Sequence, residues 1–392
     1  KRFFSMKLLH ITTDEKFIDS IYWQFNEVFE GQNKFIVFLD NNVPSPKYVT
    51  LNNNFITIKK DKNGLEYCLE KVVENDLVIL HGLNYFQSQI VLQSKNRDKF
   101  IWFFWGGEFY DNPKAIQNEI LGIKTKSQFL KTSLLHKIKT YIRPIFYHLK
   151  HATKTPELMI LEAARNLKHF GVIHKEEVDF LKKRNLLSQN VNHLTMTYYP
   201  LEFIFKGIEN MKIQGDNILV GNSASMSNNH LEAFDLLEPL QINERKIIVP
   251  LSYGNKEYAQ SICKEGRHVF GKNFEPLLNF MPLEKYNIII SQCSIVIMNH
   301  YRQQSVGNIV AMIWMGSRVY LDERNTFYHY LKRIGVVVFS IKNDLHRSSE
   351  IALVGLSQSE KNLNRELLKM NIGFDIIKRQ LYKNITEIIN EY

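Results

Sequence analysis

The sequence is poor in cysteine and contains no cysteine pair of the kind that binds a metal or forms a disulfide framework. Its 392 residues include three cysteines, Cys68, Cys263 and Cys293. An odd, widely spaced set without a Cys-x-x-Cys motif argues against a disulfide scaffold and against a structural zinc site. Such a cysteine content is typical of a reducing compartment, and we expect the cytoplasm.

Long apolar runs are also missing. The most apolar stretches, such as residues 288–298, are short and interrupted by polar residues, whereas a helix needs about 20 apolar residues to cross a bilayer. We therefore expect no membrane-spanning helix. The overall apolar content is ordinary, with 44% hydrophobic and 12% aromatic residues, so a chain of this length can bury two separate cores and is not disordered.

The sequence does contain a regular alternation of apolar runs and helical patterns. In the first half, strands are predicted at residues 8–12, 35–39, 55–58, 77–80, 101–104 and 169–173. The second half restarts the alternation, with strands predicted at residues 217–220, 246–250, 294–298, 318–321 and 336–339. Strands that alternate with helices predict parallel sheets, so we expect an α/β protein with two doubly wound, Rossmann-like domains.

The domain boundaries follow from the same pattern. We expect an N-terminal domain at residues 6–200, because the sequence from Met6 onward reads like a natural start, and a C-terminal domain at residues 217–373. The linker between them is rich in glycine, proline and polar residues. The final helix, residues 374–392, is a candidate to pack back on the N-terminal domain. Ligands of open α/β sheets bind beyond the carboxyl ends of the strands, so we expect the two domains to face each other across a cleft.

The turn after residues 217–220 has the composition of a diphosphate-binding loop. Its candidate ligand contacts are Gly221, Asn222, Ser223 and Ser225. The turn opens into a predicted helix, whose unpaired backbone N–H groups and positive dipole end attract phosphate. It matches neither Gly-x-Gly-x-x-Gly nor the P-loop motif, so we infer neither a dinucleotide fingerprint nor a Walker site. An ordinary strand-to-helix turn, capped by Ser227 or Asn228, is the alternative.

A second polar segment follows the strand predicted at residues 294–298. Its candidate ligand contacts are Asn299, Arg302, Gln303 and Gln304. Arg302 can pair with phosphate, while the amide side chains offer donors and acceptors to sugar hydroxyls or to a base. The alternative for Arg302 is a salt bridge within the fold.

Carboxylates follow an aromatic strand in the first half. Glu108 comes after residues 101–105 and two glycines that let the backbone turn tightly. A carboxylate on an apolar floor gains basicity, so Glu108 is our first candidate for a general base that removes a hydroxyl proton, and Asp111 is the second. His81 and His174 each follow a strand and are further candidates for a base or for phosphate contact. A helix cap is the alternative for Glu108, and a structural role is the alternative for the histidines.

The excess of positive charge is concentrated in one segment. The chain carries 50 Lys and Arg against 40 Asp and Glu, a formal charge of +10. Residues 121–155 contain eight of these cations and no acid, which leaves +2 for the rest of the chain. Apolar residues from Leu130 to Leu149 share one face of a helical wheel, and Pro144 is expected to kink or divide this element. A basic amphipathic helix is typical of binding to a membrane surface, and packing of its apolar face on the sheet is the alternative.

Several of these motifs, taken in order, resemble those of glycosyltransferase family 56. The residues that carry the resemblance are His81-Gly82, Trp105-Gly106-Gly107-Glu108-Phe109-Tyr110, Leu219-Val220-Gly221-Asn222-Ser223 with Ser227-Asn228 and His230, Val249-Pro250, Arg302-Gln303-Gln304, and Asn325 with Phe327. The family contains the TDP-4-acetamido-4,6-dideoxygalactose:lipid II transferases of enterobacterial common antigen assembly. The resemblance implies a GT-B fold, a donor site on the C-terminal domain, an undecaprenyl-diphosphate-linked acceptor and no requirement for a bound metal.

The residues and the resemblance together predict a peripheral glycosyltransferase on the cytoplasmic face of the bacterial inner membrane. The Gly221 turn and Arg302 are expected to hold the diphosphate of a nucleotide-sugar donor in place of a metal ion, with no other cofactor. Glu108 is expected to deprotonate the acceptor, a lipid-linked saccharide. The side chains expected to contact the sugar or the nucleoside are Tyr253, Gln303, Gln304 and Asn325.

Two other functions remain open at this point. A non-catalytic binder of nucleotide sugars or polyanions, docked to the membrane by the basic helix, needs the same donor site but no base. Nucleic-acid binding would instead place the cations along a groove lined with stacking aromatic residues. The concentration of positive charge in one amphipathic element argues against nucleic acid as a partner.

Overall fold

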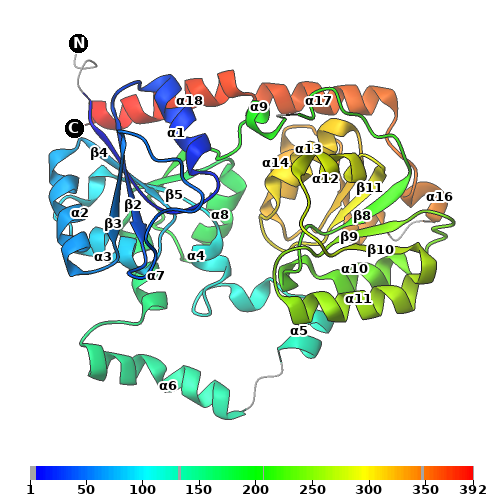
Figure 1. Cartoon of the computed structure of the whole chain (residues 1–392), viewed down its shortest axis with the longest axis horizontal. Coiled ribbons are helices and arrows are strands. Elements are labelled where there is room, and N and C mark those ends of the chain that lie inside the picture. The colour runs from blue at the N-terminus through cyan, green and yellow to red at the C-terminus, as the bar shows by residue number, and fades with distance from the viewer. Residues whose placement is uncertain (1–5, 131–133, 206, 346–347, 392) are drawn as a thin grey trace. The chain divides into compact units, whose positions relative to one another are not determined.

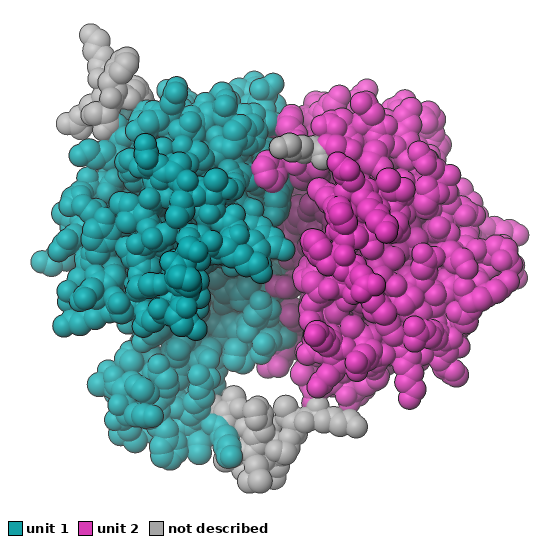
Figure 2. Space-filling view, in the orientation of Figure 1, with its two compact units in different colours: residues 1–117, 135–200, 374–392 teal, residues 118–134, 201–373 magenta. Residues whose placement is uncertain are grey.

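The computed structural model describes residues 6–130, 134–205, 207–345 and 348–391. The chain forms two compact units (Figures 1 and 2). Unit 1 contains residues 1–117, 135–200 and 374–392, and unit 2 contains residues 118–134 and 201–373. This corrects the expectation of a continuous N-terminal domain at residues 6–200, because a short segment within that range belongs to unit 2.

Unit 1 is built around a seven-stranded parallel sheet with the order β3-β2-β1-β4-β5-β6-β7. Its strands are β1 (Leu8–Thr13), β2 (Asn33–Leu39), β3 (Phe55–Lys59), β4 (Leu77–His81), β5 (Phe100–Phe103), β6 (His169–Val172) and β7 (Asn192–Thr195). The nearly continuous apolar run of β2 is typical of a parallel strand that is covered on both faces. The chain order reverses between β1 and β4, and His81 stands at the carboxyl end of β4.

Helices cover both faces of this sheet (Figure 1). The helices of unit 1 are α1 (Ile18–Val28), α2 (Lys62–Glu74), α3 (Tyr85–Gln93), α4 (Gly107–Tyr110), α6 (Leu134–His151), α7 (Pro156–Asn166), α8 (Lys175–Lys183) and α18 (Phe374–Asn390). Of these, α6 lies away from the sheet (Figure 1). The C-terminal helix α18 packs against α1 and β7. The Trp23 ring stacks on the Phe374 ring with centroids 4.2 Å apart, and Asn384 Nδ2 donates a hydrogen bond to the carbonyl of Thr195 at 3.1 Å.

Unit 2 contains a six-stranded parallel sheet with the order β10-β9-β8-β11-β12-β13. Its strands are β8 (Asn217–Val220), β9 (Ile247–Pro250), β10 (Phe274–Leu277), β11 (Cys293–Met298), β12 (Arg318–Leu321) and β13 (Phe339–Ser340). The helices are α5 (Ile123–Phe129), α9 (Leu201–Ile204), α10 (His230–Leu237), α11 (Lys256–Phe270), α12 (Leu283–Ile290), α13 (Val306–Met315), α14 (Thr326–Arg333), α15 (Ile341–Asp344), α16 (Ser349–Ala352) and α17 (Gln358–Ile372). The helices α10 and α11 pack on one face of the sheet, and α12 and α13 cover the other (Figure 1).

The sequence does not predict the edge strands β7 and β10. The strand β7 is short and polar, and β10 contains Pro276. An edge strand pairs on one side only, so it needs neither a long apolar run nor every backbone N–H group. The strand predicted at residues 336–339 is also shorter and later than expected, because β13 comprises Phe339 and Ser340.

The basic segment at residues 121–155 is divided, but not at Pro144, where the sequence predicts a kink or a division. It forms two helices, of which α5 belongs to unit 2 and α6 to unit 1. The helix α6 continues through Pro144 rather than ending there. Residues 131–133 lie outside the described residues. Among the helices that are described, none is both long enough and apolar enough to cross a membrane.

Candidate functional site

The turn after β8 begins with a glycine that no other residue can replace without strain. Gly221 has a φ of 68°, which lies in the left-handed region that favours glycine. A Cβ atom at this position would lie 2.6 Å from His230 Nε2 and 2.7 Å from Asn228 Oδ1. The backbone of the turn therefore runs directly against two buried polar side chains.

Asn228 holds the rest of this turn. The residue is fully buried, and its Oδ1 accepts the backbone N–H of Asn222 at 2.9 Å. Its Nδ2 donates to the carbonyls of Ser223 and Ser225, at 3.1 Å each. Neither Asn228 nor Ser227 caps α10 with its side chain, so the turn is not the ordinary capped turn of the alternative interpretation.

Gln304 joins the Gly221 turn to Arg302. Its Oε1 accepts a hydrogen bond from Arg302 Nε at 2.9 Å and another from Ser227 Oγ at 2.7 Å. Ser227 Oγ in turn lies 2.9 Å from Ser225 Oγ. The two polar segments that the sequence singles out, one after β8 and one after β11, therefore meet in the structure. Gln303 is half-buried beside them.

His300 connects the same two segments below the surface. Its Nε2 lies 2.9 Å from Asn228 Oδ1 and 3.1 Å from Asn222 Oδ1. Both partner atoms are amide oxygens, which accept hydrogen bonds, so His300 Nε2 carries the hydrogen. Burial lowers the pKa of His300 to about 3, which keeps the ring neutral at physiological pH. The sequence does not reveal that His300 and Asn228 belong to this network, because hydrogen bonds between distant segments leave no local pattern.

Two candidate donor contacts are buried in the fold. Asn299 is 2% exposed, and its Nδ2 donates to the carbonyl of Asn229 at 3.1 Å. Asn325 is fully buried, and its Oδ1 accepts the backbone N–H of Phe327 at 3.0 Å as the N-cap of α14. Both side chains support the strand ends from inside, whereas Arg302 and Gln304 are only half-buried.

Tyr253 is the candidate that stands furthest into solvent. Its side chain is 62% exposed, and its hydroxyl accepts a hydrogen bond from Asn222 Nδ2 at 3.4 Å. The loop after β9 is fastened to the turn by the backbone, since Ala224 N–H donates to the carbonyl of Tyr253 at 2.8 Å. The ends of β8, β9 and β11 thus contribute to one site.

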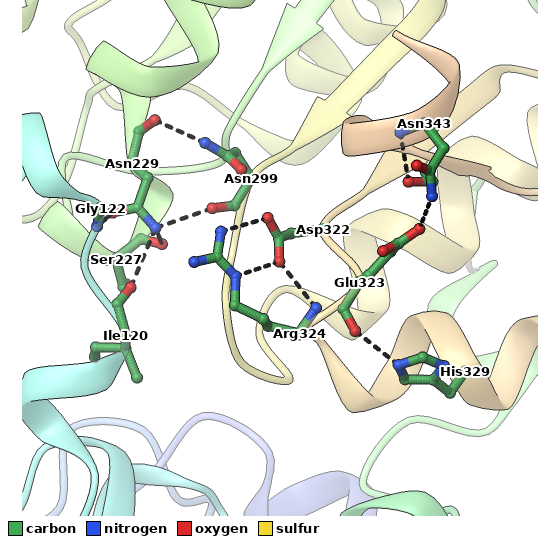
Figure 3. A network of polar contacts seen from close by, with 11 residues as sticks. Ile120, Gly122, Ser227, Asn229, Asn299, Asp322, Glu323, Arg324, His329 and Asn343 are labelled. Atoms are coloured by element: carbon green, nitrogen blue, oxygen red, sulfur yellow. Dashed lines mark hydrogen bonds and ion pairs between the residues drawn. The ribbon is translucent and has the colours of Figure 1, made fainter. Parts of the chain in front are cut away.

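A polar pocket of about 460 Å³ adjoins this site at the ends of β11 and β12. Arg324 lines this pocket, and its guanidinium carbon lies 3.2 Å from the centroid of the Tyr301 ring, which also lines it. The same guanidinium donates to both carboxylate oxygens of Asp322 at 2.7 Å (Figure 3). The side chains at the end of β11 therefore alternate: Asn299 and Tyr301 line the pocket, whereas His300 and Arg302 contact the turn or its partner Gln304.

Glu108 in unit 1 lies on an apolar floor, as its sequence setting predicts. It is 9% exposed, and its Oε1 accepts the Trp102 indole N–H at 3.3 Å and the backbone N–H of Trp105 at 3.2 Å. Its Oε2 is buried and has no hydrogen-bond partner among the described residues. Burial raises the pKa of Glu108 to about 7. Such a carboxylate can accept a proton near neutral pH.

The other titratable candidates of unit 1 have different surroundings. Asp111 is exposed at the C-terminal end of α4. His174 is buried as the N-cap of α8, where its Nδ1 accepts the backbone N–H of Glu177 at 3.3 Å. Asp111 is thus accessible to a substrate, whereas His174 has the structural surroundings of the alternative interpretation.

His81 lies inside the core of the sheet. It is fully buried, and its Nε2 lies 2.9 Å from His10 Nδ1. The other nitrogen of His10 lies 3.2 Å from Asn33 Oδ1. Burial lowers the pKa of His81 well below its usual value, so the residue stays neutral. A neutral histidine without solvent access is poorly placed to act as a base.

Within the described parts of the chain, no three His, Cys, Asp or Glu side chains are grouped as an ion site requires.

The architecture is shared with several solved structures. Sucrose-phosphate synthase from Thermosynechococcus elongatus is 11% identical with a TM-score of 0.61, and the match covers 99% of this chain and 100% of that one. The α,α-trehalose 6-phosphate synthase of Burkholderia multivorans is 10% identical with a TM-score of 0.58, over 99% and 98% of the two chains. HepE of Anabaena, solved in complex with UDP and glucose, is 10% identical with a TM-score of 0.60, over 97% and 100%.

At such low identity these likenesses show the fold, which is GT-B. The match to a family model identifies the family. Residues 152–363 match the model described as 4-alpha-L-fucosyltransferase glycosyl transferase group 56, which is more than half of the chain. This range contains the Gly221 turn, Tyr253 and the Arg302 segment. The chain therefore belongs to glycosyltransferase group 56 and is a glycosyltransferase with the GT-B fold.

Proposed function

We propose that this protein transfers an amino-deoxy sugar from a TDP-sugar to a lipid-linked saccharide, carried on undecaprenyl diphosphate, at the cytoplasmic face of the bacterial inner membrane. The observation that carries the proposal is the junction at Gln304, which fastens Arg302 to the Gly221 turn. The family description names a fucosyl group, which is a 6-deoxyhexose, and this supports a deoxy sugar.

In this proposal the donor diphosphate lies against the turn from Gly221 to Ser225. The N–H groups of Gly221, Asn222 and Ala224 already donate within the fold. The backbone N–H groups of Ser223 and Ser225, together with the Arg302 guanidinium, therefore neutralise the charge that develops on the leaving nucleoside diphosphate. Arg302 is held by a neutral amide oxygen through its Nε, so its charge is not cancelled by that contact. The positive charge thus replaces a divalent ion, and the reaction is metal-independent.

The acceptor hydroxyl loses its proton to Glu108. The pKa of about 7 makes this carboxylate a stronger base than an exposed glutamate and leaves about half of it ionised at neutral pH. Its unpartnered Oε2 is the oxygen that takes the proton. Asp111, the exposed C-cap residue of α4, is the second candidate for this role.

The helix α6 provides the contact with the membrane. Ile145 and Phe146 are each 63% exposed and Leu149 is 76% exposed, so these apolar side chains are not packed on the sheet. Lys139 and Lys150 are exposed on the same helix. Apolar side chains that enter the headgroup region, together with cations near anionic lipid, are the means by which amphipathic helices bind a bilayer surface.

The experiment that tests the proposal is a release assay over TDP-, UDP- and GDP-sugars, each with undecaprenyl-diphosphate-linked saccharides as acceptors. We expect release of TDP that depends on the acceptor, with the new glycosidic linkage identified by NMR. Donor binding without acceptor-dependent release would support the non-catalytic binder instead.

A further inference from the structure

A short segment that precedes α6 docks on unit 2 beside the Gly221 turn. Residues 118–134 belong to unit 2, although residues 1–117 and 135–200 on either side belong to unit 1 (Figure 2). Within this segment α5 packs against α10, the helix that follows the turn. We call the described part of this contact, residues 120–129, the docked segment.

One end of the docked segment is hydrogen-bonded to Asn229, the N-cap residue of α10 (Figure 3). Asn229 Oδ1 accepts the backbone N–H of Gly122 at 2.8 Å. Asn229 Nδ2 donates to the carbonyl of Ile120 at 3.1 Å and to that of Asn299 at 3.0 Å. Asn229 is fully buried and has a left-handed φ of 51°. This amide therefore links the docked segment to the end of the turn and to the end of β11.

The middle of the docked segment is fastened to the first turn of α10. Glu232 accepts the backbone N–H of Thr125 at 2.9 Å through one carboxylate oxygen and the Thr125 hydroxyl at 2.6 Å through the other. Thr125 is fully buried. The approach is so close that a Cβ atom at Gly122 would lie 2.0 Å from Glu232 Oε1.

The other end of the docked segment is linked to Gly221 through Tyr258 and His230. The Phe129 ring contacts the Tyr258 ring edge-on, with centroids 4.8 Å apart. The Tyr258 hydroxyl lies 3.0 Å from His230 Nδ1, and the opposite nitrogen of His230 is the atom that leaves no room for a Cβ at Gly221. One end of the segment thus contacts Asn229 directly, and the other reaches His230, beside Gly221, through Tyr258.

We propose that the docked segment is a positioning element of the donor site, which holds the Gly221 turn in its diphosphate-binding shape through Asn229, Glu232 and Tyr258. The proposal rests on the proposed function of that turn. None of these residues contacts the donor in the proposal. Their contribution is to keep the turn in one arrangement before the donor arrives, so that less ordering is needed on binding.

Thermodynamic linkage makes the proposal measurable in two directions. If docking of the segment strengthens donor binding, then donor binding must strengthen docking by the same factor. Trypsin reports docking, because Lys124 and Lys126 lie within the segment and cleavage after them requires release from α10. TDP should therefore slow cleavage at these two lysines in the wild-type protein.

The test compares full-length variants that alter docking without altering the turn. Thr125→Val keeps the side-chain shape but removes the hydroxyl, and Gly122→Ala forces the segment away from Glu232. Each should raise the rate of cleavage at Lys124 and Lys126 and the Kd for TDP, by roughly tenfold for the loss of one charge-assisted hydrogen bond. Thr125→Ser keeps the hydroxyl and should restore both values toward wild type.

A matched control separates positioning from general destabilisation. Ser317 precedes β12, and its hydroxyl donates a buried hydrogen bond of 2.8 Å to the carbonyl of Cys293 in β11. Ser317→Ala removes this hydrogen bond. It should lower the unfolding temperature but leave the Kd for TDP unchanged below that temperature. Faster cleavage of Thr125→Val or Gly122→Ala with an unchanged Kd for TDP would overturn the proposal. A wild-type protein that does not bind TDP would instead show that the proposed function of the turn is wrong.

Discussion

Gln304 accepts a hydrogen bond of 2.7 Å from Ser227, a residue 77 positions earlier in the chain. Ser227 lies at the turn after β8, and Gln304 lies after β11, the strand next to it in the sheet. Because Gln304 also accepts from Arg302 Nε, this contact sets the position of the guanidinium relative to the turn. The proposed donor site depends on that arrangement.

Replacing Gln304 should weaken the donor site without removing its charge. In Gln304→Ala, Arg302 and Ser227 lose their shared acceptor, so the hydrogen bond that links the guanidinium to the turn is removed. We expect the KM for the donor to rise roughly tenfold, the effect of one lost hydrogen bond to a charged group. Steady-state kinetics with the donor varied provide the measurement. A larger effect on kcat than on KM would contradict the assignment.

Gly221→Ala should damage the turn for steric reasons. The added Cβ meets His230 Nε2 and Asn228 Oδ1 at less than 3 Å, and the left-handed φ adds a cost of about 1 kcal/mol. We expect TDP binding to be lost or weakened at least tenfold, as measured by calorimetry. Gly355→Ala is the control, because nothing lies within 4 Å of a Cβ there. Equal TDP binding by the two variants would show that the turn is not part of the donor site.

The rate should depend on the ionisation of Glu108. Burial raises its pKa to about 7, and a base acts in its deprotonated form, so kcat/KM should rise with pH and level off above about 7. Glu108→Gln should lower kcat by roughly 10²- to 10⁴-fold, the usual effect of a general base. A pH–rate profile of the wild type and an assay of the variant provide the check. A rate that is undiminished in Glu108→Gln would contradict the role, and Asp111→Asn then becomes the variant to measure.

The same carboxylate should reduce stability at high pH. A folded-state pKa raised above the unfolded value of 4.5 favours the protonated native state, so the free energy of unfolding falls as pH rises from 4.5 to about 7. The fall is on the order of 3 kcal/mol, at about 1.4 kcal/mol per pKa unit. Glu108→Gln removes the charge and should therefore be more stable than the wild type at pH 8. Denaturant titrations at pH 5 and pH 8 test this, and a variant that is less stable at pH 8 would contradict it.

Membrane binding should depend on the exposed apolar face of α6. A triple change of Ile145, Phe146 and Leu149 to serine removes side chains that are at least 63% exposed, so it should spare the fold. We expect flotation with vesicles of mixed phosphatidylglycerol and phosphatidylethanolamine to be lost, while TDP binding remains. Val73→Ser changes an apolar side chain that is 77% exposed on another helix of unit 1 and should leave flotation unchanged. Unaltered flotation of the triple variant would show that α6 is not the anchor.

The sequence predicts the two sheets well because most of their strands are buried and apolar. The strands β7 and β10 are not predicted, because edge strands tolerate polar residues and proline. The position of the docked segment in unit 2 is not predicted either, since it depends on long-range contacts such as that of Gly122 with Asn229. At the site, the strand-end rule correctly locates the Gly221 and Arg302 segments side by side. It does not distinguish accessible residues from buried ones such as Asn325 and His81, since burial is decided by the neighbouring strands.

The most direct test of the donor site is a calorimetric titration of TDP in the presence of EDTA. In the proposal, Arg302 and the backbone of the Gly221 turn hold the diphosphate without a metal ion. Wild-type protein should therefore bind TDP with the same Kd in EDTA as in magnesium. Arg302→Ala should raise that Kd by roughly 10- to 100-fold, as expected for loss of charge-assisted hydrogen bonds to a phosphate. Binding that disappears in EDTA, or that is unchanged in Arg302→Ala, would contradict the proposed donor site.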